Sequence, residues 1–387
     1  MTPNLASPIW DDLLGQPEAI EQIDLAIRHK NEGVHHAWLI TGPPGSGRSN
    51  LALAFAAGLL CSQGGCGNCK SCVMVKSQTH PDLTVLATER VVISIDEVRS
   101  LVASSQFGGS MGRFRIMIIE DADRMAERSS NVLLKALEEP PGGTVWILCA
   151  PSEADMLPTI RSRVRRVGLK VPSVEDVASL LVERDGIDPQ LAAQSAAEAQ
   201  SHIGMARRLA TSQDARVRRR DSLTIALDID SVTAAVNAAD RWLEVAKKDA
   251  DALTSERDEQ EREELLRVMG VEPGTTVPTN LRPELKNLEE SQKRRATRSL
   301  RDAIDRILID LISLYRDVLT IQLSAQTALV NEQFRVRIEE VAKNSTAAQS
   351  IAKIEFMNQA RERIDANVRD LLVLESVAVT IRNRAKS

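Results

Sequence analysis

Residues 38–49 decide the fold of the N-terminal part of this chain, and they read Trp38-Leu39-Ile40-Thr41-Gly42-Pro43-Pro44-Gly45-Ser46-Gly47-Arg48-Ser49. An apolar, strand-like run enters a glycine-rich loop, and the segment 49–60 that follows has helical periodicity. This is the spacing of a phosphate-binding loop (P-loop), in which glycines let backbone N–H groups surround phosphate oxygens at a helix N-terminus. We therefore expect residues 42–49 to bind a nucleotide.

Arg48 departs from the P-loop pattern, which has lysine at this position. The arginine keeps the positive charge, but its planar fork does not replace a compact ammonium between the β- and γ-phosphates. Ser49 keeps the hydroxyl group that binds Mg²⁺. The loop therefore favours binding of ATP with Mg²⁺ and argues against efficient hydrolysis.

A second feature of P-loop enzymes is an apolar strand that ends in carboxylates, and residues 116–119 followed by Glu120 and Asp121 have this form. One such carboxylate joins the metal shell and another polarises water, usually in the order Asp then Glu. The order is reversed here, which shifts the reach of each carboxylate by about one methylene group and impairs the positioning of water. A strand that merely ends in acidic residues is the alternative.

The first 170 residues alternate short apolar runs with helical segments such as 129–139, which predicts a parallel sheet covered by helices on both faces. The runs that we expect to be strands are 37–41, 82–88, 114–119, 144–150 and 164–171. Residues 171–212 form a short zone rich in Ala and Leu, in which Ser173 and Asp176 predict a capped helix start. From 213 to 387 only helical periods are found, so the fold class is α/β plus all-α.

Four of the five cysteines lie close together, at Cys61, Cys66, Cys69 and Cys72. Thiolates are soft ligands, and four at such short spacings can close a tetrahedral Zn²⁺ site with no open position. We therefore expect a structural zinc module over residues 61–72, with unligated buried thiols as the alternative. Cys149 is expected in the core, and His80 in a turn before a strand rather than as a further ligand.

Residues 241–300 hold 12 basic and 13 acidic side chains and contain a Pro/Gly break at 272–274. Runs of mixed sign are usually faces of solvated helices, so we expect a long helical excursion with a flexible tip. Contact between the basic cluster at 293–298 and a phosphate backbone is the alternative. After the excursion, two apolar stripes have the i, i+3, i+4 spacing of a helix face, either in the core of the domain or partly at a surface that other subunits cover. They are Ile304, Ile307, Leu308, Leu311 and Leu314, and Ile351, Ile354, Met357, Ile364, Val368, Leu371 and Leu372.

Composition excludes several classes of protein. The 387 residues carry a net charge of −5 and are 43% apolar, 27% charged and only 3% aromatic. The longest apolar run, residues 51–61, is about half of the ~20 residues that span a bilayer, and the N-terminus has no secretory pattern. Membrane and secreted classes are therefore not expected, nor is a protein that coats DNA by bulk charge.

Together, these motifs resemble the bacterial DNA polymerase III clamp-loader subunits of the AAA+ class, and the delta-prime type most closely. The segments that carry the resemblance are Leu14-Gly15-Gln16, the P-loop, the four-cysteine insert, His80-Pro81-Asp82, residues 131–141 and Ser162-Arg163-Val164. The resemblance is dense over residues 12–210 and thin beyond them.

The resemblance implies an AAA+ P-loop domain with a zinc insert (1–170), a small helical lid (171–212), and a helical collar or oligomerisation domain (213–387) with a charged insertion at about 241–300. It implies a cytoplasmic, replisome-associated assembly with gamma/tau and delta subunits that loads the sliding clamp onto primed DNA. Contact of this subunit with the clamp itself would be indirect or weak. Arg163 matches an arginine finger that reaches the ATP of a neighbouring subunit, and Arg207 matches an arginine that senses the γ-phosphate in its own chain.

The departures from the pattern indicate which kind of subunit this is. Arg48, the Glu120-Asp121 order, and Ala150-Pro151-Ser152 in place of a polar sensor imply a delta-prime stator whose own ATPase is weak or absent. Such a chain is an accessory subunit of the polymerase holoenzyme. The alternatives are an ATP-hydrolysing gamma/tau-like motor subunit of the same clamp loader and a zinc-bearing signalling NTPase that shares only the P-loop scaffold.

Overall fold

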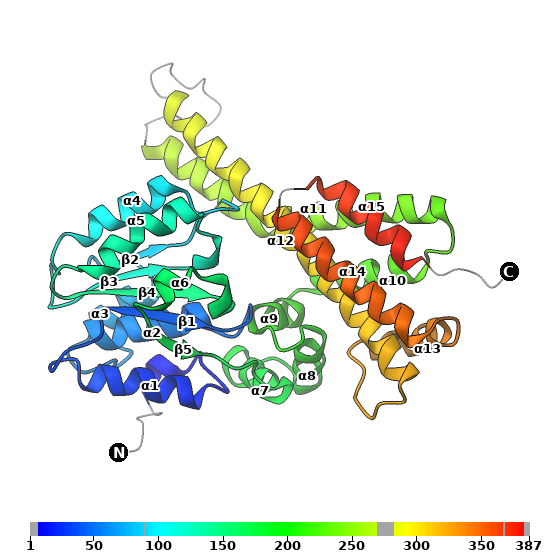
Figure 1. Cartoon of the computed structure of the whole chain (residues 1–387), viewed down its shortest axis with the longest axis horizontal. Coiled ribbons are helices and arrows are strands. Elements are labelled where there is room, and N and C mark those ends of the chain that lie inside the picture. The colour runs from blue at the N-terminus through cyan, green and yellow to red at the C-terminus, as the bar shows by residue number, and fades with distance from the viewer. Residues whose placement is uncertain (1–6, 89, 269–281, 367, 383–387) are drawn as a thin grey trace. The chain divides into compact units, whose positions relative to one another are not determined.

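The computed structural model describes residues 7–88, 90–268, 282–366 and 368–382 (Figure 1). The chain divides into two compact units, residues 1–211 (unit 1) and 212–387 (unit 2). The Pro/Gly break expected at 272–274 lies outside the described residues. Within those residues, no helix has the length and apolar character needed to cross a membrane.

Unit 1 is built on a five-stranded parallel sheet in the order β2-β3-β4-β1-β5. The strands are β1 (Ala37–Thr41), β2 (Leu83–Leu86), β3 (Arg115–Ile119), β4 (Thr144–Ala150) and β5 (Arg165–Gly168). Every expected run is confirmed as a strand. The runs predicted at 82–88, 114–119 and 164–171 are longer than the strands by one to four residues, because residues that flank a strand share its sequence pattern without pairing in the ladder.

Helices cover both faces of this sheet (Figure 1). Side chains alternate along β1, so that Trp38 and Ile40 face one core and Ala37 and Leu39 face the other. The first core is closed by α1 (Pro17–Arg28), α2 (Arg48–Leu60) and α3 (Lys70–Lys76), and the second by α4 (Ile95–Ser105), α5 (Glu127–Glu138) and α6 (Pro158–Arg161). Short 3₁₀ turns lie at Pro8–Trp10, Ala122–Arg124 and Glu153–Asp155. Burial on both faces explains why β1, β3 and β4 are almost continuously apolar, whereas the edge strand β5 has two exposed arginines.

Three helices complete unit 1: α7 (Val174–Asp185), α8 (Pro189–Glu198) and α9 (Ile203–Thr211). The predicted start of α7 is confirmed: the Ser173 side chain accepts the Asp176 N–H, and the Asp176 carboxylate accepts the Ser173 N–H. This reciprocal capping box satisfies two backbone donors at the helix start.

Unit 2 contains helices α10 (Gln213–Leu227), α11 (Val232–Val268), α12 (Arg282–Gln322), α13 (Arg335–Lys343), α14 (Ala347–Asp365) and α15 (Asp370–Ile381), with a 3₁₀ turn at Glu332–Phe334. They share one apolar core that includes Trp242, Leu311, Tyr315 and Met357. The predicted stripe from Ile304 to Leu314 lies in this core, so these residues form the interior of the unit itself. No strand is found among the described residues of unit 2, as the helical periods predict.

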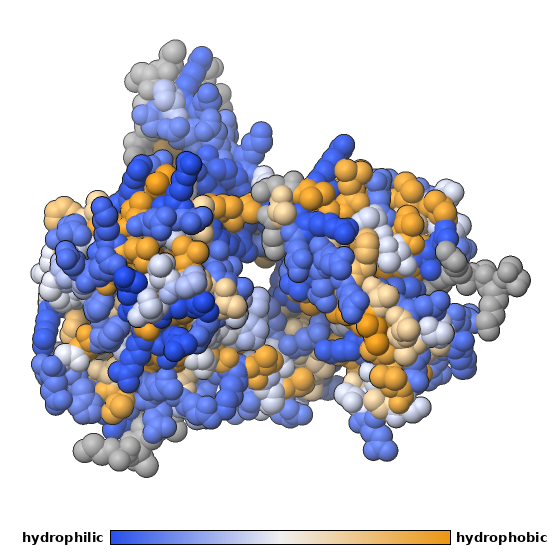
Figure 2. Space-filling model, viewed as in Figure 1, coloured by the Kyte–Doolittle hydropathy of each residue, from blue (hydrophilic) through white to orange (hydrophobic). Residues whose placement is uncertain are grey.

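The charged excursion consists of the far ends of α11 and α12, residues 250–268 and 282–300, which we call the arm (Figure 1). Its surface in view is mainly hydrophilic (Figure 2). Arg295 is only 8% exposed, and its guanidinium pairs with Asp258 and with Glu261, the latter at 2.9 Å. Arg295 therefore does not belong to an exposed basic cluster, because its charge is used inside the arm to join the two helices.

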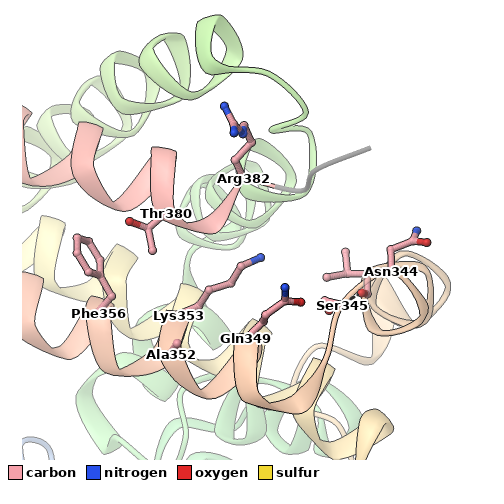
Figure 3. A pocket seen from close by; sticks show the side chains of 9 residues that line it. Asn344, Ser345, Gln349, Ala352, Lys353, Phe356, Thr380 and Arg382 are labelled. Carbon is pink, nitrogen blue, oxygen red and sulfur yellow. Dashed lines mark hydrogen bonds between the residues drawn. The ribbon is translucent and has the colours of Figure 1, made fainter. Parts of the chain in front are cut away.

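A cavity of about 510 Å³ lies in unit 2 between α14 and the end of α15 (Figure 3). The Lys353 amine extends from α14 beside this cavity, donates to the Ile381 carbonyl at 3.0 Å, and lies 4.7 Å from the centre of the Tyr315 ring. The Tyr315 hydroxyl donates to the same carbonyl at 2.9 Å. Burial lowers the pKa of Lys353 to about 8. Both groups satisfy the C-terminal end of α15 and fix it against α12 and α14.

Candidate functional site

The P-loop joins the carboxyl end of β1 to the first turn of α2, as the sequence predicts. Gly45 (φ +80°) and Gly47 (φ +96°) occupy the left-handed region, which side chains with a Cβ rarely adopt. The Gly42 N–H donates to the carbonyl groups that end β4, and the Ser46 N–H donates to the Pro43 carbonyl at 3.1 Å. Pro43 and Pro44 thus lie in a short loop that is closed on itself before the helix begins.

The Arg48 side chain points toward the carboxylates at the end of β3. Its Nη2 atom lies 3.5 Å from Oδ1 of Asp121, and its side chain is only 11% exposed. Asp121 itself has a left-handed backbone (φ +49°), and the Glu120 N–H donates to the Leu86 carbonyl. The fold therefore brings together Arg48, Glu120 and Asp121, three of the residues at which the sequence departs from a hydrolytic P-loop site.

Three buried polar atoms beside the P-loop have no hydrogen-bond partner among the residues that the structure describes: Nη1 of Arg48, Oγ of Ser46 and Oδ1 of Asp123. Burial raises the pKa of Asp123, and the charge of Asp121 adds to this effect. Buried polar groups are normally satisfied, and two of these atoms are donors. The donors Arg48 and Ser46 thus fit an anionic ligand such as a phosphate group.

A cavity of about 450 Å³ opens beside the P-loop and is lined by Gly45, Gly47, Arg48, Ser49 and residues of α7 and α9. It includes Arg207, the predicted sensor, whose side chain is 60% exposed and lies 3.2 Å from the Asp185 carboxylate. Arg184 also lines it and pairs with Asp12 at 3.1 Å. Arg207 thus lies near the loop and forms an ion pair with Asp185.

His202 is a residue of this site that sequence reasoning missed. Its ring lies directly over the P-loop, where a Cβ at Gly45 would collide with it, and the Ile203 N–H donates to the Gly45 carbonyl at 3.3 Å. The start of α9 therefore rests on the phosphate-binding loop. The position of His202 just before the predicted 204–207 segment was the available signal, but spacing alone does not show which residue contacts the loop.

Arg163 lies far along the chain from the P-loop residues, just before β5. Its Nη2 atom is 2.6 Å from Oε1 of Glu138, and Nη1 donates to the Thr159 carbonyl at 2.8 Å. The side chain is 36% exposed, and these contacts hold it on the surface of its own unit. Among the described residues, the contacts of Arg163 are with Glu138, Thr159 and Ser162, and the structure does not bring it to the P-loop of its own chain.

The four predicted metal ligands converge. The ligand atoms of Cys61, Cys66, Cys69 and Cys72 all lie within 4.8 Å of one another. The Sγ atom of Cys61 is 3.7 Å from that of Cys66 and 3.7 Å from that of Cys69. Four sulfurs about 2.3 Å from a tetrahedral ion are about 3.8 Å apart, so this cluster fits a metal ion with four thiolate ligands.

Backbone N–H groups around the cluster favour the ionised sulfur. Burial opposes ionisation of Cys61, but the N–H groups of Cys66, Gly65 and Gln63 and the Cys69 thiol outweigh it and lower the pKa of Cys61 to about 6. Hydrogen bonds from the N–H groups of Asn68 and Cys69 lower the pKa of Cys66. Metal binding needs thiolates, so these hydrogen bonds favour ligation by Cys61 and Cys66, whereas burial raises the pKa of Cys72.

Two further predictions about this region are confirmed. His80 is 3% exposed and bonds to the Ser71 hydroxyl through Nε2, while Nδ1 accepts the Asp82 N–H, so it lies in the turn before β2 and outside the ligand cluster. Cys149 is 1% exposed in β4, and burial raises the pKa of its thiol. Both residues are structural.

With β1 between β4 and β5 and the P-loop at the carboxyl end of β1, unit 1 is a P-loop domain of the AAA+ class. A family model described as "DNA polymerase III, delta subunit" matches residues 15–173. Residues 15–173 are therefore similar to this family, and the known proteins that resemble the same region include DNA polymerase III delta' subunits.

The DNA polymerase III subunit delta' of Pseudomonas aeruginosa is 39% identical over 143 residues, which cover 35% of this chain and 44% of that protein. The subunit delta' of Escherichia coli is 35% identical over 137 residues, covering 34% of this chain and 41% of that protein. The chain thus spans less than half the length of these relatives. The subunit tau/gamma of Haemophilus influenzae is 32% identical over 164 residues, covering 41% of this chain and 23% of that protein.

Proposed function

We propose that this protein is a delta-prime-type subunit of a bacterial DNA polymerase III clamp loader, which helps to load the sliding clamp onto primed DNA without hydrolysing ATP itself. The observation that carries the proposal is the pairing of Arg48 with Asp121. The charge that should reach the β- and γ-phosphates is directed instead at Asp121, a strand-end carboxylate. The similarity of residues 15–173 to delta-prime subunits supports the same role.

In this proposal, residues 171–212 act as the lid and unit 2 as the collar that joins gamma/tau and delta subunits, while contact with the clamp is indirect or weak. Large apolar side chains at the surface of α14 and α15 support an interface there: Ile351 is 44% exposed and Leu372 is 55% exposed. The same helices carry the core residues Met357 and Leu374 on their inner sides. Apolar groups on the outer side of a helix are suited to contact another subunit.

We further propose that the four-cysteine cluster holds Zn²⁺. All four ligands are sulfur, which suits a closed structural site and leaves no position for a substrate. The module links the end of α2 to α3, so the ion would fix the path of the chain between these helices rather than take part in chemistry.

The isolated chain should show negligible steady-state ATP turnover, because Arg48, Glu120 and Asp121 affect different parts of the phosphoryl-transfer site. Turnover is measured with saturating ATP and Mg²⁺ on the full chain and on Ser49→Ala, which removes the hydroxyl expected to bind the metal. A rate near the ~1 s⁻¹ of working NTPases that is lost in Ser49→Ala would contradict the stator role. It would favour the gamma/tau-like motor, a reading that similarity to tau/gamma subunits leaves open.

Arg163→Ala should leave folding, metal content and assembly intact but lower the DNA- and clamp-stimulated ATPase of the reconstituted complex by about tenfold. In the assembly, the guanidinium would leave Glu138 and stabilise charge on the phosphate of the neighbouring subunit. Fingers of this kind contribute ~10³–10⁵ in rate when they act alone, and a ring with several sites dilutes the effect. Steady-state ATPase of the complex is the measurement.

Arg166→Ala is the matched control, because Arg166 is also exposed and paired with an acid, Glu153, at 2.6 Å. It should leave the rate unchanged. Arg163→Lys should restore little activity, since one ammonium does not reproduce the planar two-point contact. Wild-type clamp loading by Arg163→Ala would show that Arg163 is an ordinary surface charge. Failure of the tagged chain to retain clamp-loader subunits from its native extract would instead favour the signalling NTPase.

A further inference from the structure

Lys30 connects two parts of unit 1 that are distant in sequence. It follows α1, yet its ammonium group lies at the C-terminal end of α2, where it donates to the carbonyl of Gly58 at 2.9 Å and to that of Leu59 at 3.4 Å. It also donates to the carbonyl of Cys61, the first of the four cysteines. The last carbonyl groups of a helix lack partners within the helix, so Lys30 caps α2.

Capping alone does not account for where this charge lies. The hydrogen bond to the Cys61 carbonyl holds the ammonium group against the backbone of a predicted metal ligand. Cys61 and Cys72 are the most buried cysteines of the cluster, at 1% and 3% residue exposure. The ammonium group thus lies near the most buried part of the cluster, where a negative charge is most costly.

Four thiolates around a divalent ion carry a net charge of about −2, which needs compensation when the site is partly buried. The other two lysines of this module, Lys70 and Lys76 on α3, are exposed to solvent. Groups outside the ligand shell commonly tune a metal site by hydrogen bonding and charge. Among these three lysines, Lys30 alone is partly buried and fixed by several hydrogen bonds.

We infer that Lys30 is the internal counter-cation of the four-cysteine centre: held by the end of α2, it offsets part of the charge of the metal–thiolate cluster and strengthens metal binding. This inference rests on the proposed metal site. In this role Lys30 does more than cap α2. A chain that folds in the same way but lacks the charge of Lys30 would bind the metal less tightly.

Two variants separate the counter-cation role from capping. Lys30→Gln keeps N–H donors for the helix carbonyls but removes the charge, whereas Lys30→Arg keeps both. If capping were the whole role, the glutamine and arginine variants would bind zinc equally well. If charge matters, only the arginine variant should behave like the wild type. Lys76→Gln removes an exposed lysine from the same module and is the matched control.

Zinc affinity of the full chain is measured at pH 7.5 by competition with a chromophoric chelator. Lys30→Gln should bind zinc about 10- to 100-fold more weakly than the wild type, the range found when groups around metal ligands are changed. Lys30→Arg and Lys76→Gln should stay within about threefold of the wild type. The absorption spectrum of the Co²⁺-loaded variants checks that four sulfurs still bind the ion.

Each outcome bears on a different claim. Zinc affinity of Lys30→Gln within about threefold of the wild type overturns the role of Lys30 while leaving the metal site in place. A wild-type chain that binds neither zinc nor cobalt shows that the metal site itself is wrong. If Lys30→Gln does not fold, the arginine variant decides: a folded Lys30→Arg chain with weakened zinc affinity also overturns the inference, and unchanged affinity supports it.

Discussion

The double variant Cys66→Ser, Cys69→Ser is expected to lose its metal ion and the folded structure of residues 61–80, while the parallel sheet survives. Ligation of a structural zinc ion contributes on the order of 10 kcal/mol, and a loop of this length has little apolar surface to replace it. Gly64, Gly65 and Gly67 all have left-handed backbones in the loop, which the unligated chain has little reason to hold. Metal analysis and hydrogen exchange over residues 61–80 measure the two effects.

Cys149→Ala is the control for this experiment, because Cys149 is a cysteine of the same unit that lies outside the ligand cluster. It should keep a full equivalent of zinc even though the loss of a buried side chain lowers stability. Less than about half an equivalent of zinc in freshly purified wild-type protein would count against the metal centre.

Arg219→Met is expected to destabilise unit 2 by about 3 kcal/mol, because it leaves a buried carboxylate without its main partner. Arg219 is 6% exposed and donates through Nε to Asp310 at 3.1 Å and through Nη2 to Asn331 at 2.6 Å. The Asn331 amide in turn donates to Asp317 and to the hydroxyl of Ser313. The value is at the lower end of the usual range, since the charge of Arg306 also acts with Asp310.

Hydrogen exchange of the helices of unit 2 in the full chain, at increasing denaturant concentration, measures this loss. Arg220→Met is the control, because Arg220 is the next residue on α10 and is exposed, so its loss should cost less than about 0.5 kcal/mol. The double variant Arg219→Met, Asp310→Leu should recover part of the stability, as it removes the stranded charge. Equal stability of Arg219→Met and Arg220→Met would mean that the network does not stabilise the unit.

The sequence predicted best what depends on neighbouring residues in the chain. The strands β1 and β4 have the predicted bounds, because a fully buried parallel strand is an apolar run that ends where the chain turns. The cysteine cluster was equally clear, since four ligands within one short loop need no distant partner. The capped start of α7 followed from two residues three positions apart.

What the sequence did not reveal are contacts between segments that meet only in the folded chain. Nothing local to Arg163 indicates that Glu138 holds it, and nothing local to Arg295 shows that it is buried within the arm rather than exposed in a basic cluster. Helical periodicity also does not show which residues of an apolar stripe lie in the core and which lie at the surface. Met357 is buried, while Ile351 on the same helix is 44% exposed. Such assignments require the positions of the packing partners.

The histidine that rests on the P-loop affects how any phosphate-bearing ligand would have to enter. Because the ring of His202 lies against Gly45, and the backbone of Ile203 is bonded to the same residue, the loop is closed by the first turn of α9. A ligand whose phosphate takes the place of the His202 ring has to shift that turn, so its apparent affinity falls by the fraction of molecules in which the turn is open. Ligand binding to the loop and movement of the first turn of α9 are then thermodynamically coupled. Each changes the equilibrium of the other by the same free energy.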